Sequence, residues 1–268
     1  KMGESESIVT YPMELTVDNT YSYTLPVGVF NVPGIEYHIV ATDINGIEAR
    51  SPVDVGFYSI NAWVSDVNST NEVYGGSEQT AYRMISIPLY LNSTLIVDQL
   101  VDTLPPGKME TDWRLFRYPD GSTTPQEYPD IEPFLPGRAF WLITVDNFVL
   151  NTSEGKTVPT DERFRIDLNS GWNDIANPWM FDISWDNIEN PGNANLSALY
   201  TYEGQWSDPT NPPKIMEPWK GYAIKNLESS TKLIFLRTGS MVEKTVVAQE
   251  TEVWRLSIRA SAGEAKDT

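Results

Sequence analysis

The sequence predicts an all-β fold in which one β unit occurs twice, and three observations carry this prediction. Residues 134–144 (FLPGRAFWLIT) recur at residues 215–226 (IMEPWKGYAIKN), and the two segments align without a gap, with Pro136 on Pro218. Short segments in which polar and apolar residues alternate recur along the chain, which is the pattern of half-buried strands. The 19 prolines and 17 glycines fit this interpretation, because both residues favour turns over helix interiors. The sequence therefore favours strands joined by turns.

The duplication extends upstream of this first pair of segments. Residues 82–91 (YRMISIPLYL) align with residues 172–181 (WNDIANPWMF). Between these landmarks, LFRYPDG at 115–121 matches LYTYEG at 199–204. Self-similarity over this length is the sequence signature of a structural repeat.

The repeat defines a predicted domain over residues 80–239, with halves at about 80–147 and 164–226. A half-domain β unit gains most by burying its apolar face on its own duplicate, so we expect approximate twofold symmetry between the halves. We also expect Arg138 and its counterpart Lys220 each to lie over a neighbouring ring and to reach an acid or a carbonyl with the charged group. The alignment makes these residues equivalent: Pro88 and Pro178, Ile85 and Ile175, Phe140 and Tyr222, Arg138 and Lys220.

Residues 1–66 are predicted to be part of an immunoglobulin-like sandwich. Alternating segments at 14–25, 35–42 and 55–64 predict short strands. Asp43-Ile44-Asn45-Gly46 predicts a hairpin turn, because Asn and Gly tolerate positive φ. The segment supplies about four to five strands, too few for the roughly seven of a closed sandwich.

Three further segments complete the predicted organisation. Residues 67–79 are polar, contain Gly75-Gly76 and show no sustained period, so we interpret them as a linker. Residues 93–104 (STLIVDQLVDTL) place apolar residues at steps of four after a serine, which predicts one short helix. Residues 240–268 are predicted to start a further β domain or to form an extended terminal strand, with alternation at 252–260. Unpaired strands recruit other strands, so we expect strand-mediated self-assembly or pairing with neighbouring β domains of a longer chain.

Composition narrows the possible partners. The 37 acidic and 19 basic residues give a formal net charge of −18. Nucleic acid and anionic membranes bind basic patches, so neither is an expected partner. The chain has no run of about 18 apolar residues, so no membrane insertion is expected. It has no cysteine, which argues against a small disulfide scaffold but not against a large exported bacterial β protein.

The sequence offers no catalytic constellation, so we expect no enzyme and no cofactor. The single histidine, His38, has no cysteine or Gly-x-Ser-x-Gly elbow to work with, and a partly buried strand residue is the simpler interpretation. Gly155-Lys156-Thr157 resembles the end of a phosphate loop, but Leu150 occupies the position of the first glycine, so we predict a hairpin turn there. The 37 carboxylates leave a glycoside-cleaving pair open without singling one out.

No metal site is predicted, although two acidic groups leave structural calcium open. Asp43-x-Asn45-Gly46 resembles the start of an EF-hand loop but lacks the bidentate acid at the twelfth position. Asp182, Asp186 and Glu189 form a second loose group. Acidic loops between strands are more often solvated surface, which is the simpler interpretation.

Aromatic residues are concentrated between 172 and 222. Exposed rings flanked by Asp and Asn could stack on sugar rings, whereas buried rings would pack the sheets. If they are exposed, the ligand-binding candidates are Trp179, Trp185, Trp206 and Trp219. Large aromatic residues tend to be buried, so core packing is the competing interpretation. The exposure of Trp206 and Trp219 decides between these two alternatives.

One segment resembles a known family. The run PGIEYHIVATDINGIEARSP is similar to fibronectin type III-like domains of large secreted bacterial proteins, and the duplicated unit resembles the modules beside such domains in multidomain surface proteins of the Bacteroidetes type. The resemblance implies a secreted, extracellular or cell-surface location and a modular architecture, and it provides no catalytic residue. The residues that carry it are Gly34, Glu36, Tyr37, Ala41, Thr42, Asp43 and Gly46.

These observations predict a non-catalytic structural, adhesion or presentation module. The alternative is a carbohydrate-binding module of a polysaccharide-degrading enzyme, in which exposed Trp and Tyr residues stack on a polysaccharide. A hydrolase is the third alternative, and it would require a cleft with two facing carboxylates.

Overall fold

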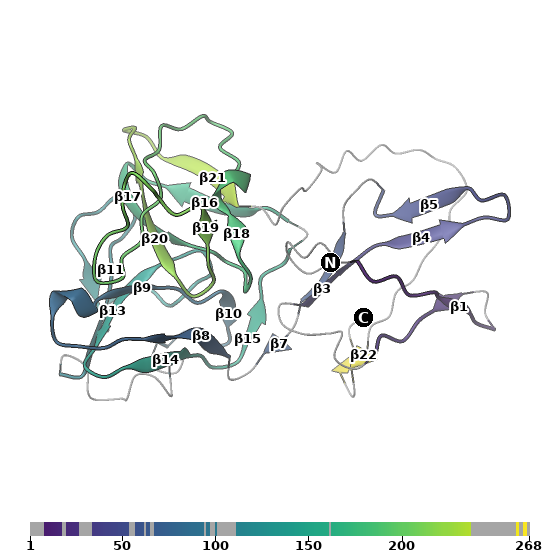
Figure 1. Ribbon diagram of the computed structural model, residues 1–268, viewed down its shortest axis with the longest axis horizontal. Coiled ribbons are helices and arrows are strands. Elements are labelled where there is room, and N and C mark those ends of the chain that lie inside the picture. Colours follow the sequence, from purple (N-terminus) through teal and green to yellow (C-terminus); the bar gives the residue numbers. More distant parts are fainter. Residues whose placement is uncertain are drawn as a thin grey trace.

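The computed structural model describes residues 8–17, 20–26, 34–53, 57–61, 63–64, 67–93, 95–96, 100, 111–160, 162–236, 261–262 and 265–266. The described residues confirm the all-β fold class (Figure 1). Besides strands they contain two single 3-10 turns, η1 (Gln79–Ala81) and η2 (Trp185–Asn187).

The first half of the duplicated region is built on one four-stranded antiparallel sheet with the order β12-β11-β13-β9. Beside it lies a three-stranded sheet with the order β10-β15-β7. The strands of the two sheets are β9 (Arg83–Ile85), β11 (Trp113–Arg117), β12 (Gln126–Glu127), β13 (Phe140–Thr144), β7 (Trp63–Val64), β10 (Leu89–Leu91) and β15 (Gly155–Thr157).

The second half consists of three antiparallel strand pairs, β16-β21, β17-β20 and β18-β19. The segment around Tyr200 joins β20 through an antiparallel bridge to Ala223. The strands are β16 (Phe164–Leu168), β17 (Gly171–Ala176), β18 (Ile183–Ser184), β19 (Ile215–Met216), β20 (Gly221–Asn226) and β21 (Lys232–Leu236).

The strand pairing confirms the equivalences that the sequence alignment predicted. Ile85 pairs with Phe140 in the first half, and the aligned Ile175 pairs with Tyr222 in the second. On the other side of the central strand, Phe116 pairs with Trp141, and the aligned residues Tyr200 and Ala223 form the corresponding bridge. Both halves therefore have the same order of three strands in the same register.

Contacts between the halves are reciprocal. Ile85 bridges to Lys220, and the equivalent Ile175 bridges to Arg138. The amide of Ser86 donates to the carbonyl of Trp219 at 2.9 Å, and the amide of the equivalent Ala176 donates to the carbonyl of Gly137 at 3.0 Å. Each contact occurs once in each direction, which is what a twofold relation between duplicated units produces.

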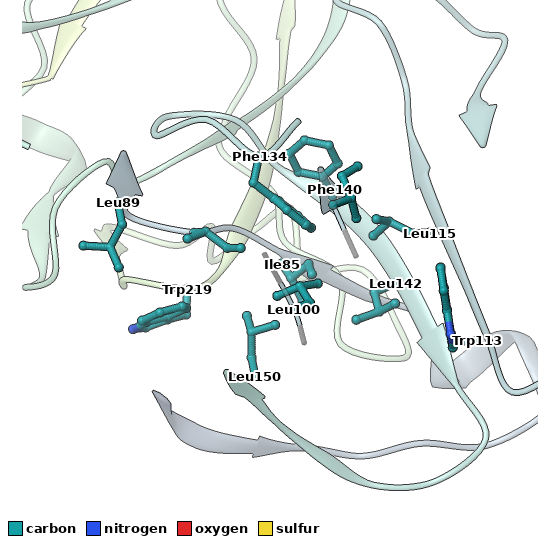
Figure 2. Close-up of a cluster of buried hydrophobic side chains, with 12 residues drawn as sticks. Ile85, Leu89, Leu100, Trp113, Leu115, Phe134, Phe140, Leu142, Leu150 and Trp219 are labelled. Carbon is teal, nitrogen blue, oxygen red and sulfur yellow. The ribbon is translucent and has the colours of Figure 1, made fainter. Parts of the chain in front are cut away.

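Two hydrophobic cores lie in the two halves. The first contains side chains of β9, β10, β11, β13 and β14 (Phe148–Asn151), and Phe140 is one of them (Figure 2). It also receives Trp219, which comes from the second half. The second core surrounds Tyr222 and contains only residues between 158 and 236. Burial of this apolar surface is the dominant favourable term in holding the halves folded.

The turn before the last shared strand is also duplicated. Gly137 and the aligned Trp219 both have positive φ, +79° and +67°. After the turn, Arg138 pairs with Asp120, and the equivalent Lys220 pairs with Glu203 at 2.6 Å. Burial lowers the pKa of Lys220, but Glu203 and Glu217 outweigh burial and raise that pKa.

The expected charge partners of Arg138 and Lys220 are thus confirmed, whereas the expected ring contact is not described for either residue. Among the described residues, the cations that lie over rings are Arg50, Arg114, Arg163 and Lys225.

Two predicted loops are strands instead. Within the predicted linker 67–79, β8 (Asn68–Val73) pairs with β14, so the segment belongs to a sheet. The polar sequence of β8 did not indicate a strand, because backbone pairing at an exposed edge does not require alternating apolar residues. The hairpin turn predicted at Gly155-Lys156-Thr157 is wrong as well, since these residues form β15 between β10 and β7.

The predicted helix at 93–104 lies largely outside the described residues. Where it is described, the Leu95 amide donates to Ser93 Oγ and the Leu100 amide donates to the Ile96 carbonyl, as in a helical turn. The alternating segment 252–260 lies wholly outside the described residues, and the last described pair is β22 (Ser261–Ala262) with β23 (Ala265–Lys266).

The N-terminal region contains the predicted hairpins. Within it, β4 (Ile39–Thr42) pairs with β5 (Glu48–Ser51) across the Asp43–Gly46 turn, and Gly46 has a φ of +81°. Two more pairs are β1 (Glu14–Leu15) with β2 (Tyr21–Ser22) and β3 (Gly34–Tyr37) with β6 (Tyr58–Asn61). Figure 1 shows β1, β3, β4 and β5 apart from the strands of the duplicated region. The immunoglobulin-like relationship of this region remains a prediction.

Candidate aromatic surface site

The four predicted tryptophans have different environments. Trp179 and Trp219 are buried, with 1% and 6% of their surface exposed. Trp185 is half-buried against the second core. Trp206 has 49% of its surface exposed. The condition of exposure that the sequence analysis set therefore fails for Trp179 and Trp219 and is met by Trp206.

Local contacts explain why Trp179 and Trp219 are unavailable to a ligand. Trp179 donates its indole N–H to the Pro159 carbonyl at 2.8 Å and lies at the position equivalent to the buried Leu89. Trp219 follows a proline in a turn of the second half and has a positive φ. Its ring lies in the first core (Figure 2). Both rings are structural.

Trp206 belongs to a group of five rings, named here the aromatic cluster: Trp141, Trp172, Tyr200, Tyr202 and Trp206. Trp206 contacts three of the others edge to face, with ring centroids 5.6 Å from Trp141, 5.4 Å from Tyr202 and 6.4 Å from Tyr200. Tyr200 continues the row to Trp172 at 5.8 Å. Edge-to-face contacts at these separations stabilise aromatic groups beyond the burial of their area.

Small residues lie beneath the cluster at the junction of the halves. Ala139, Ala176 and Ala223 are buried together with Met84, and Trp141, Tyr200 and Tyr202 pack against them. The three alanines come from strands or turns of both halves. Short side chains here let three large rings lie close to the backbone, which fixes the orientation of the cluster.

A buried carboxyl group holds one ring of the cluster. Asp174 accepts a hydrogen bond from the Trp141 indole N–H at 3.0 Å, and only 5% of the aspartate is exposed. Burial raises the pKa of Asp174 to about 7, against the opposing effects of the Trp141 hydrogen bond and the Arg117 charge. The nearby Asp120 raises this pKa further and is itself paired with Arg117 and Arg138.

Both of these carboxyl groups have partners inside the protein: Asp174 accepts from Trp141, and Asp120 pairs with Arg117 and Arg138. What the arrangement offers is a rigid surface of rings. Trp206 and Trp172 provide its open area, with 49% and 42% of their surfaces exposed. Polar residues accompany these rings. The Lys225 ammonium lies over the Trp172 ring, 5.8 Å from its centroid, and Glu203, Gln205 and Asp208 are exposed and close to Trp206 in sequence.

The remaining sequence candidates have ordinary structural roles. His38 packs edge-on against Phe57 at 5.2 Å, and burial and the Arg50 charge lower its pKa. Asp43 accepts bonds from the amides of Ile47 and Asn45, which lower its pKa, so its carboxylate closes a turn. Glu189 pairs with Arg163 at 2.7 Å. Within the described ranges, no group of three or more His, Cys, Asp or Glu side chains could hold a metal ion.

The chain was compared with family models, with curated proteins and with solved structures, and none of the three comparisons finds a match. Over the part of the chain that the structure describes, no helix is long and apolar enough to span a membrane. The fold and the site therefore define the class: an all-β protein with an internal duplication and an aromatic cluster over the junction of its halves.

Proposed function

We propose that this chain is a non-catalytic carbohydrate-binding module of a secreted or cell-surface protein, and that the aromatic cluster binds a neutral polysaccharide. The observation that carries the proposal is the exposure of Trp206 and Trp172 in one continuous group of rings. Adhesion to a glycan surface and presentation of neighbouring β domains would follow from such binding.

The chemistry of the cluster favours sugar rings. The C–H face of a pyranose is apolar and flat, so it covers an indole ring, while its hydroxyl groups project sideways toward polar groups. The Lys225 ammonium lies over the Trp172 ring, 5.8 Å from its centroid, and can donate to such hydroxyls. Exposed apolar surface that polar residues surround is typical of an interaction site.

The charge of the chain selects among polysaccharides. A formal net charge of −18 repels polyanions such as uronic-acid or sulfated polymers. A neutral glycan avoids this repulsion. The rings beneath the ligand are already fixed by mutual contacts and by the Asp174 hydrogen bond, so binding orders few protein side chains.

The test is binding of the purified chain to soluble neutral glucans, mannans and xylans by affinity electrophoresis and calorimetry. Trp206→Ala and Trp172→Ala each remove an exposed stacking surface, and we expect each to weaken binding about fivefold, since a stacked ring contributes about 1 kcal/mol. Tyr90→Ala is the matched control, because Tyr90 is 45% exposed and lies on β10, outside the cluster.

Equal losses for Tyr90→Ala and Trp206→Ala would contradict a specific role of the cluster. Absence of binding to every polysaccharide tested would contradict the proposed function itself. Release of new reducing ends during the incubation would contradict a non-catalytic module.

A further inference from the structure

The first half contains a second pair of surface rings at the positions equivalent to the first site. In the second half Trp172 and Tyr200 lie 5.8 Å apart. The sequence alignment makes Tyr82 and Phe116 their counterparts, and these two rings lie 6.1 Å apart. The pair is therefore conserved between the halves as a contact, although both residue types have changed.

Strand register places the two pairs on the same side of their sheets. Phe116 pairs with Trp141, as Tyr200 bridges to the equivalent Ala223. Neighbouring residues in a strand point to opposite faces, so both pairs point away from the cores that contain Leu115 and Leu199. Tyr82 and Phe116 are half-buried, which leaves part of each ring at the surface.

A cation lies over one ring of each pair. The Arg114 guanidinium is 4.7 Å from the Phe116 centroid, and the Lys225 ammonium is 5.8 Å from that of Trp172. Arg114 also forms a two-pronged ion pair with Glu127, with nitrogen–oxygen distances of 2.7 and 3.0 Å. This pair fixes a planar donor over one face of the Phe116 ring, with a carboxylate acceptor beside that donor.

We propose that Tyr82, Phe116, Arg114 and Glu127 form a second sugar-binding site, so that one chain engages two segments of the same neutral polysaccharide. The proposal rests on the proposed function. The Tyr82 ring supplies stacking, Phe116 packs between Tyr82 and the Arg114 guanidinium, and the Arg114–Glu127 pair offers a donor and an acceptor to neighbouring hydroxyl groups. Two sites on one chain give a long polysaccharide an advantage over a short oligosaccharide, because the second contact forms at high effective concentration.

The experiment is a calorimetric titration with cellohexaose, mannohexaose and xylohexaose, together with the parent polysaccharides. For the hexasaccharide that binds, we expect two equivalents per chain. Phe116→Ala and, separately, Arg114→Met with Glu127→Gln should each reduce the stoichiometry to one. Trp206→Ala combined with Trp172→Ala should also leave one. Each loss should weaken polysaccharide binding by about a hundredfold through lost avidity.

The Arg114→Met, Glu127→Gln variant keeps the Phe116 ring in place, so it tests the site even if Phe116→Ala fails to fold. One equivalent in the wild type, lost with the tryptophan variants and unchanged in the Arg114 and Glu127 variant, would overturn the second site and leave the proposed function intact. Absence of binding in the wild type would overturn both.

Discussion

The two halves of the duplicated region have equivalent residues in their two cores, and they differ on the surface where they meet. Phe140 and Tyr222 are equivalent, and both are completely buried. One residue further along each strand, the first half has Trp141 and the second has Ala223. At the paired position, the first half has Met84 and the second has Asp174. Core positions have therefore kept their apolar character while the junction has become asymmetric.

The asymmetry is complementary. The Trp141 indole of the first half donates to the Asp174 carboxyl group of the second half, and it contacts Trp206 and Tyr202. Ala223 is small, which leaves room for these rings above it. If both halves carried tryptophan at this position, two indoles would compete for one space. The difference between Trp141 and Ala223 thus explains why one large cluster lies at the junction of the halves.

The largest expected effect comes from the shared core position. Phe140→Ala and Tyr222→Ala should each reduce the free energy of unfolding by about 3–5 kcal/mol, because each leaves a cavity at a completely buried site. Urea denaturation measures the change. Tyr90→Ala, at an exposed site, should stay within about 0.5 kcal/mol of the wild type.

The same pair also distinguishes the halves. Tyr222 Oη accepts from the Glu217 amide at 2.8 Å and donates to the Ile215 carbonyl at 3.2 Å, so Tyr222→Phe should cost about 1–2 kcal/mol. A loss below about 1 kcal/mol for either alanine variant would show that the equivalent positions do not carry equivalent cores.

The next prediction concerns Asp174, whose pKa in the folded state is raised by burial from 3.8 to about 7. Between these values the folded state holds a proton that the unfolded state has lost. The stabilising contribution of the protonated group is therefore complete below about pH 4 and is lost as the pH rises through 7. Since one pKa unit corresponds to about 1.4 kcal/mol, the loss is at most about 4 kcal/mol.

Asp174→Asn should remove this dependence. The amide oxygen still accepts from the Trp141 indole, so the variant should be more stable than the wild type at pH 8 and similar to it near pH 4. Urea denaturation between pH 4 and 8 provides the measurement, with the exposed Asp167→Asn on β16 as control. A constant difference between Asp174→Asn and wild type across this range would rule out titration of Asp174 as the cause.

The sequence predicted the parts of the site that follow from local pattern and missed those that depend on tertiary contact. Alignment of the repeat made Ile85 equivalent to Ile175 and Phe140 equivalent to Tyr222, and the structure pairs Ile85 with Phe140 and Ile175 with Tyr222. Trp206 was one of the four tryptophans named as candidates if exposed, and 49% of its surface is exposed. Trp219 was a candidate only if exposed, and it is buried in the core of the other half, a contact that no local pattern shows.

Trp141 and Asp174 were missed for a related reason. They lie 33 positions apart in the sequence, and only the packing of the halves brings them together. The repeat contained a usable signal, because the large Trp141 of one copy aligns with the small Ala223 of the other. The alignment of the polar Asp174 with the apolar Met84 is a second such signal. Comparison of the outer faces would have pointed to the junction.

The smallest expected effects come from the duplicated ion pairs, which are buried to different extents in the two halves. Asp120 is 10% exposed and pairs with both Arg138 and Arg117, whereas Glu203 is 58% exposed. Arg138→Met should therefore cost about 1–2 kcal/mol, and Lys220→Met less than about 1 kcal/mol because water and salt screen exposed pairs.

Thermal unfolding at low and at about 1 M salt should show a salt-dependent loss for Lys220→Met and a largely salt-independent one for Arg138→Met. Lys156→Met, at an exposed position on β15, is the control. If both variants lost the same stability at both salt concentrations, the two pairs would be energetically equivalent, and the duplication would have conserved this contact in strength as well as in position.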